Sequence, residues 1–196
     1  MDYVKEAKEL GFSNAAIMDT QKLIFKPEYR RCCEENQCGC YNVNPACPPE
    51  SGTVETMKQR ALTYEKTLIL QTIQSRHSDY KKVKFAHNKL TEQLASKIEE
   101  SGNRDLLIMS AGPYKHHSCM SAYCIDAQEM ADAVGMICWG NDDKIRYFSQ
   151  ILFHVKARET VDFFDFLSWS MSLSLYNTRN RSIFILYKIT NLFIYK

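Results

Sequence analysis

The sequence predicts an α/β fold: a single layered domain in which helices flank a small mixed sheet of about four strands. Segments with helical periodicity alternate with short apolar runs from residue 53 onward. The chain has 196 residues, which is enough for one domain with a core of its own. Apolar residues make up 45% and charged residues 24%, so the material for such a core is present.

The elements follow from periodicity and from residues that start or stop helices. Asp79 and Asp126 can cap helices, while Gly11 and Gly102 can end them. The helix after Asp79 presents an apolar face made by Val83, Ala86, Leu90, Leu94 and Ile98. Helices are therefore expected at residues 2–10, 53–66, 80–101 and 127–134, and strands at 15–18, 67–73, 106–109 and 145–155.

Residues 19–52 lack regular periodicity and form a long predicted loop. Four of the five prolines lie there, and proline removes the backbone donors that helices and sheets need. Five of the eight cysteines fall within the same stretch: Cys32, Cys33, Cys38, Cys40 and Cys47. Thiolates bind soft metals and iron–sulfur clusters, and a bound metal would order a loop that has no other framework. Segment 30–52 is therefore the predicted metal site.

The expected ligands are Cys33, Cys38, Cys47 and Cys40, with Cys32 as a weaker candidate because adjacent cysteines point apart. The spacing is Cys33-x4-Cys38-x8-Cys47, which contains no Cys-x2-Cys pair. Four sulfurs suit either tetrahedral zinc or a four-iron cluster, and ligand softness alone does not separate them.

A second group of candidate ligands follows the strand at residues 106–109. It contains Cys119, Cys124 and His117, which rank below the loop cysteines. Adjacent histidines seldom bind one ion together, so at most one of His116 and His117 is expected to be a ligand. Cys138, beside a tryptophan in an apolar context, is expected in the core.

Charge and composition narrow the partners and the compartment. A net charge of +2 is too small to predict nucleic-acid binding. Charged residues near the N-terminus leave no apolar signal-peptide core, so a cytoplasmic protein is expected. Domain 1–156 is expected to hold the site. The apolar tail 157–196 is atypical and has no uncharged run long enough for a transmembrane helix; poor order or contact with a membrane surface are the alternatives.

Several stretches resemble one family. They are Arg31-x-Cys33-Glu-x-Asn36-x-Cys38-Gly39 with Tyr41, Cys47-Pro48-Pro49-x-x-Gly52, Ala111-Gly112-Pro113, Ser121-Ala-Tyr-Cys-Ile-Asp126 and Tyr147-Phe148-Ser149. Over about residues 8–154 the chain is similar to uncharacterised prokaryotic proteins, common in anaerobes, described as predicted metal-binding proteins. The resemblance implies that Cys33, Cys38 and Cys47 are motif cysteines and that Cys40 occupies a variable position. It also implies a second, ferredoxin-like cysteine group after Pro113, and this chain lacks that segment.

Three functions are compatible with these features. The first is an iron–sulfur protein, with a 4Fe-4S type of cluster, that acts in electron transfer or as an accessory protein with a redox partner. The second is a structural zinc site in an interaction module. The third is a metal-dependent redox enzyme that uses side chains near residues 114–124. No phosphate-binding glycine loop and no His-Glu-x-x-His helix points to other chemistry.

Overall fold

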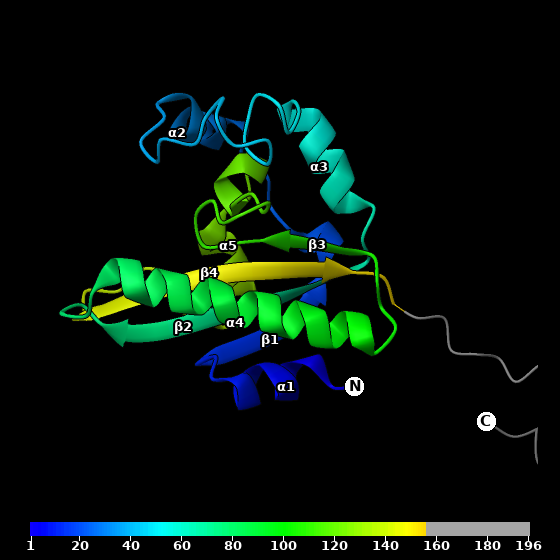
Figure 1. Ribbon diagram of the computed structural model, residues 1–196, viewed down its shortest axis with the longest axis vertical. Coiled ribbons are helices and arrows are strands. Elements are labelled where there is room, and N and C mark those ends of the chain that lie inside the picture. Colours follow the sequence, from blue (N-terminus) through cyan, green and yellow to red (C-terminus); the bar gives the residue numbers. More distant parts are fainter. Residues whose placement is uncertain (156–196) are drawn as a thin grey trace, which may run out of the picture. The chain divides into compact units, whose positions relative to one another are not determined.

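The computed structural model describes residues 1–155 (Figure 1), so the expectations for the tail lie outside the described residues. In chain order the elements are α1 (Tyr3–Leu10), β1 (Asn14–Asp19), the 3-10 helices η1 (Thr20–Lys22) and η2 (Pro27–Tyr29), α2 (Arg30–Glu34), α3 (Val54–Leu62), β2 (Lys66–Ser75), α4 (Tyr80–Glu100), β3 (Leu106–Met109), the 3-10 helix η3 (Met120–Tyr123), α5 (Ala127–Ala133) and β4 (Lys144–Phe153). The predicted α/β fold class is confirmed.

The helix boundaries follow from the capping residues. The Asp79 and Asp126 carboxylates accept the first backbone N–H groups of α4 and α5, and Asp2 does the same for α1. Gly11 ends α1 with a φ of 111°, a conformation that a side chain would strain. Within residues 1–155, no helix has both the length and the apolar character needed to cross a bilayer.

The sheet has the strand order β1-β2-β4-β3, and its three strand pairs are all antiparallel. The expected mixed pairing is therefore wrong. β2 and β3 do run in the same direction and are connected through α4, but β4 lies between them and pairs with both. In the sequence, a strand–helix–strand run of this kind predicts two parallel strands that pair with each other. No local feature of the sequence shows that the later strand β4 lies between β2 and β3.

The sheet separates two cores. On one face, α1 and α4 pack on the strands through residues that include Ala7, Leu68, Leu94, Ile98 and Ile151. On the other face, the core joins the sheet to α3, η3 and α5 through residues that include Met57, Ile69, Met109, Tyr123 and Met130. In Figure 1, α4 lies along the sheet, and α2 and the cysteine-rich segment lie beyond η3 and α5. The second core thus carries the region of the predicted site.

Helix α4 buries a more polar face than the sequence predicts. Ala86 is exposed, whereas His87, Asn88 and Thr91 are buried. Each buried side chain has a partner: His87 Nδ1 lies 2.9 Å from Thr72 Oγ1, Asn88 donates to the Ala111 carbonyl, and Thr91 bonds Ser149. Burial lowers the pKa of His87 to about 4, so this histidine is neutral at physiological pH.

Candidate metal centre

Segment 30–52 is held by turns and side-chain bonds instead of a backbone ladder. Asn36, Gly39 and Asn42 adopt left-handed conformations with φ of 50°, 72° and 55°. The Asn36 side chain accepts from the Tyr41 N–H at 2.9 Å, and the Asn42 N–H donates to the Pro48 carbonyl at 2.8 Å. These bonds fold the chain back on itself between Cys33 and Cys47.

Two side-chain bonds tie this segment to residues 115–118. Asn44 Nδ2 donates to the Lys115 carbonyl at 3.1 Å, and the Ser118 hydroxyl donates to the Ala46 carbonyl. Ala46 and Ser118 directly precede Cys47 and Cys119. The two bonds therefore hold two cysteines that are far apart in the sequence on neighbouring segments.

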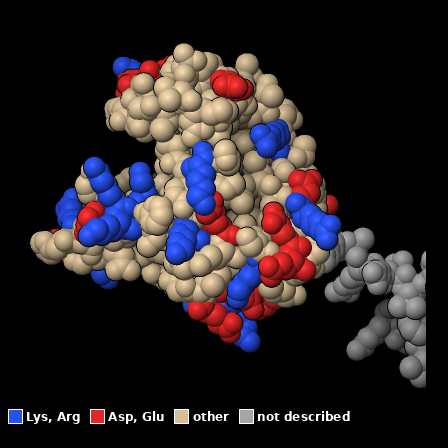
Figure 2. Space-filling view, in the orientation of Figure 1, with Lys and Arg blue, Asp and Glu red and all other residues tan. Residues whose placement is uncertain are grey.

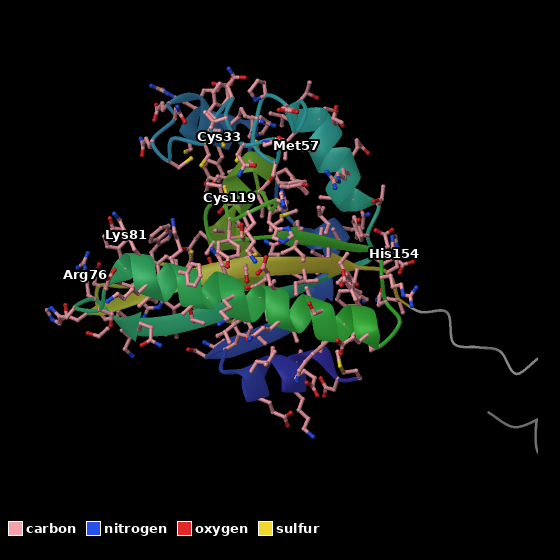
Figure 3. All side chains as sticks on the ribbon, viewed as in Figure 1. Cys33, Met57, Arg76, Lys81, Cys119 and His154 are labelled. Carbon is pink, nitrogen blue, oxygen red and sulfur yellow. The ribbon has the colours of Figure 1, made fainter. Side chains whose placement is uncertain are left out.

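Four cysteines line one enclosed cavity: Cys33, Cys38, Cys47 and Cys119. Tyr41, Pro48, Pro113 and Ala122 complete the lining. Figure 3 shows Cys33, from α2, and Cys119, which precedes η3, on the same side of the domain. Cys47 is buried, Cys33 and Cys119 are partly buried and Cys38 is exposed, so the cavity lies close to the surface.

The cavity has a volume of about 10 Å³, close to that of a single water-sized sphere. Within residues 1–155, no three His, Cys, Asp or Glu side chains stand in an arrangement that could hold a metal ion. The four thiols thus surround a common space without having the geometry of ligands. Three of them, Cys38, Cys47 and Cys119, lie outside the helices and the sheet strands.

Burial keeps the thiols of Cys33 and Cys47 protonated. It raises the pKa of Cys33 to about 12, and the nearby Cys119 thiol adds to the rise while Arg30 opposes it. Burial, followed by Cys119, raises the pKa of Cys47 to about 11. Because thiolates and not thiols bind metals, loading a metal here releases protons. Metal affinity at this cavity is therefore expected to increase with pH.

Arg30, at the start of α2, is a buried cation; from the sequence, Arg30 and Arg31 fit equally well a pair that offsets thiolate charge and a solvated surface pair. Only 8% of the residue is exposed, and within residues 1–155 no carboxylate forms an ion pair with it. Its Nη2 bonds the Gly52 carbonyl and Met57 Sδ, both at 3.3 Å, while its buried Nε has no partner in this part of the chain. A buried positive charge calls for a negative one, and the cysteine cavity is where thiolates would supply it.

Three other cysteines lie away from the cavity lining. Cys40, expected as a ligand, points its Sγ toward the Cys38 carbonyl at 3.7 Å. Cys32 is exposed on α2. Cys124 is fully buried in a left-handed conformation, and its Sγ lies 3.8 Å from the Pro27 carbonyl.

His117 and Cys138 also lie elsewhere. His117 lines a different cavity of about 430 Å³, together with Arg60, Ser118 and Tyr123, and its Nε2 is 3.8 Å from Glu92. Cys138 is buried, as expected; it belongs to the core that joins the sheet to α3, η3 and α5. The lining of the cavity beside His117 includes Ala46 and Ser118, which directly precede Cys47 and Cys119.

Sequence spacing ranks Cys119, the fourth cysteine of the cavity, below the loop cysteines. Cys119 is 72 positions beyond Cys47, and only the bonds made by Asn44 and Ser118 bring the two segments together. A usable signal exists, because Cys119 lies between two family-like stretches, Ala111-Gly112-Pro113 and Ser121–Asp126.

Comparison with known proteins gives one match. A family model described as predicted metal-binding protein, DUF2284, matches residues 16–116, which is slightly more than half of the chain. No curated protein and no solved structure matches. The matched region contains the cysteine-rich segment with Cys33, Cys38 and Cys47 and ends just before Cys119. The chain belongs to the DUF2284 family of predicted metal-binding proteins.

Proposed function

We propose that the protein binds a soft metal centre through the thiolates of Cys33, Cys38, Cys47 and Cys119. The observation that carries the proposal is the common cavity, which collects four sulfurs from segment 30–52 and from the distant segment before η3. Such convergence is what a metal–thiolate site requires, and the membership of a predicted metal-binding family agrees with it. Cys119 takes the place that spacing had given to Cys40.

The preferred occupant is an iron–sulfur cluster, with a role in electron transfer or as an accessory to a redox protein. The donor set around the cavity is all sulfur, as such clusters use. A cluster with four thiolates carries net negative charge, and the buried Arg30 offers the matching positive charge. Cys38 is exposed, so the centre would lie near the surface, where electrons can be exchanged with a partner.

A single zinc ion is the second candidate because of the cavity volume. About 10 Å³ suits one ion, whereas a cluster needs the loop segments to move apart. Zinc would give the centre a structural role, since Cys33, Cys47 and Cys119 join α2, the proline-rich loop and the segment before η3. The two candidates call for different partners, so the metal must be identified directly.

Anaerobic purification followed by metal analysis separates the two. Iron and acid-labile sulfide in equal amounts, with visible charge-transfer absorption, are expected for the cluster. A colourless protein with one equivalent of zinc would contradict the iron–sulfur cluster and support the structural zinc site. A protein that retains neither metal, even after reconstitution with iron and sulfide or with zinc, would contradict the proposed function.

A further inference from the structure

One end of the domain carries a concentration of positive charge. Figure 2 shows Lys and Arg side chains gathered where α4 begins, and Figure 3 labels Arg76 and Lys81 there. Residues 76–89 contain five such cations, Arg76, Lys81, Lys82, Lys84 and Lys89, and a single carboxylate, Asp79. The whole chain has a net charge of only +2, so the excess is local. We call these five residues, together with Tyr80 and Phe85, the basic surface.

Few of these cations form ion pairs in the described part of the chain. Within residues 1–155, Lys82 is the one member that forms an ion pair, a loose contact of 3.8 Å with Asp79, which is already engaged in capping α4. The second half of the same helix differs, because Glu92 pairs with Lys115 and Lys97 pairs with Glu6. A solvated helix face ordinarily mixes the two signs, so the first half of α4 is organised differently.

Two aromatic rings stand exposed among the lysines. Tyr80 and Phe85 are each 58% exposed, and Phe85 packs edge-on against Tyr114 with the ring centroids 5.8 Å apart. Beside Phe85 is a groove of about 620 Å³, whose lining includes Lys89, Pro113 and Tyr114 as well as Glu92, which is paired with Lys115. Aromatic anchors beside a pocket and within a charged rim are typical of protein–protein interfaces.

The basic surface adjoins the cysteine cavity. Pro113 lines both the groove and the cavity. The Lys84 ammonium also lies next to Gly112, where a Cβ atom would come within 3.3 Å of its Nζ. A partner seated in the groove would therefore lie next to the segment that holds Cys119.

We infer that the basic surface docks an acidic protein. Charge complementarity selects an acidic partner, and the groove with its exposed rings suits protruding side chains. A nucleic acid is the less favoured partner, because the chain as a whole has little net positive charge to hold a polyanion. The inference that an acidic protein docks here depends only on the charge and shape of the basic surface. The further expectation that this partner is a redox protein rests on the proposed function, because the surface lies beside the proposed metal centre.

The test uses the full chain, with an acidic flavodoxin as the probe and equilibrium binding as the readout at about 50 and about 300 mM salt. Binding is expected at low salt and should weaken strongly at high salt. The triple variant K81E/K84E/K89E should bind at least about tenfold more weakly. The control K5E/K8E/K22E has the same net charge but changes exposed lysines on and near α1 and β1, and it should bind like the original.

Three outcomes would overturn the inference: no binding of flavodoxin by the original protein, equal losses in the two triple variants, or tighter, Lys84-dependent binding of a single-stranded oligonucleotide. Metal content and unfolding temperature are measured on the same samples. Loss of binding with full metal content and an unchanged unfolding temperature supports the surface. If the original protein retains no metal even after reconstitution but still binds flavodoxin, the docking inference stands while the proposed metal function fails.

Discussion

A buried guanidinium without an ion-pair partner is costly, and within residues 1–155 no carboxylate forms an ion pair with Arg30. Its two bonds, to Gly52 and Met57, place it between the base of the cysteine-rich segment and α3. A metal–thiolate centre in the adjacent cavity would offset its charge. The metal-free protein has no such compensation. Arg30 should therefore stabilise the metal-bound form but not the metal-free form.

Replacement of Arg30 by Met is therefore expected to weaken metal retention about tenfold to a hundredfold. The unfolding temperature of the metal-free protein should not fall, because the substitution removes an uncompensated charge from the interior. Competition with a chelator measures the first quantity and thermal unfolding the second. R31M is the control, since Arg31 is exposed and paired with Glu35 at 2.8 Å; it should change neither. If R30M lowers the unfolding temperature equally in the metal-free and the metal-bound protein, Arg30 has a structural role and does not offset the charge of the metal centre.

The raised pKa values of Cys33 and Cys47 predict how the metal-free protein responds to alkali. Both thiols ionise near pH 9.0 in the unfolded chain but only at about pH 12 and 11 when folded. The unfolded state therefore loses protons first, so stability is complete below about pH 9 and falls as the pH rises through 11 to 12.

Urea unfolding of the metal-free protein at about pH 7 and about pH 10 checks this direction. The double variant C33S/C47S should show a smaller decrease in stability, because it lacks two of the thiols with a raised pKa. Some decrease should remain, because burial also raises the pKa of Cys138, to about 11. A decrease of the same size in the double variant would show that the two cavity thiols are not protonated as described.

At this scale the sequence predicts much of the cavity. The loop cysteines Cys33, Cys38 and Cys47 stand out by their crowding and by the family resemblance. The preference for Cys40 over Cys119 came from proximity in the chain, whereas the lining of the cavity depends on the contacts of Asn44 and Ser118 with a distant segment. For Arg30 and Arg31 the sequence leaves two interpretations open, a counter-charge for thiolates or a solvated surface pair, because burial is not visible in adjacent arginines.

Among the elements, α5 shows how one capping residue supports the site. The Asp126 carboxylate accepts the N–H groups of Gln128 and Glu129, and it pairs with Lys26 at 2.5 Å. Burial opposes its ionisation, but the Lys26 pair and these N–H donors hold the pKa of Asp126 below its usual value. This residue thereby joins η3 and α5 to the chain that leads into α2.

D126A should destabilise the protein by about 1–2 kcal/mol, mainly because it leaves α5 without its cap. The ion pair with Lys26 adds little, since the Lys26 side chain is 37% exposed. Denaturant unfolding measures the change. D132A is the matched control on the same helix: Asp132 is exposed, and its replacement should cost no more than about 0.5 kcal/mol. Equal effects of the two substitutions would contradict the role of Asp126.

Caps and periodicity also explain which elements could be predicted. Thr53, Asp79 and Asp126 begin their helices as the sequence indicates. The buried face of α4 departs from the prediction, because His87 bonds Thr72 through its Nδ1 and Asn88 bonds the Ala111 carbonyl, although His87 Nε2 has no partner within residues 1–155. Polar residues become admissible in a core only when partners from other elements reach them, and periodicity carries no information about such partners.

For the molecule as a whole, the antiparallel sheet is a platform with a different cover on each face. One face is sealed by α1 and α4, and the other is covered by α3, η3 and α5, with the cysteine-rich segment beyond them. Fold class and strand number follow from the alternation of elements. The strand order does not, since the insertion of β4 between β2 and β3 is decided by packing of the entire chain.

The most direct test of the account is metal stoichiometry in single Cys→Ser variants of the full chain. C33S, C38S, C47S and C119S are each expected to lose the metal that the original protein retains, whereas C40S and C138S should keep it. Retention in C119S with loss in C40S would transfer the fourth ligand to Cys40. Equal retention in all six variants would contradict the claim that this cavity is the metal site.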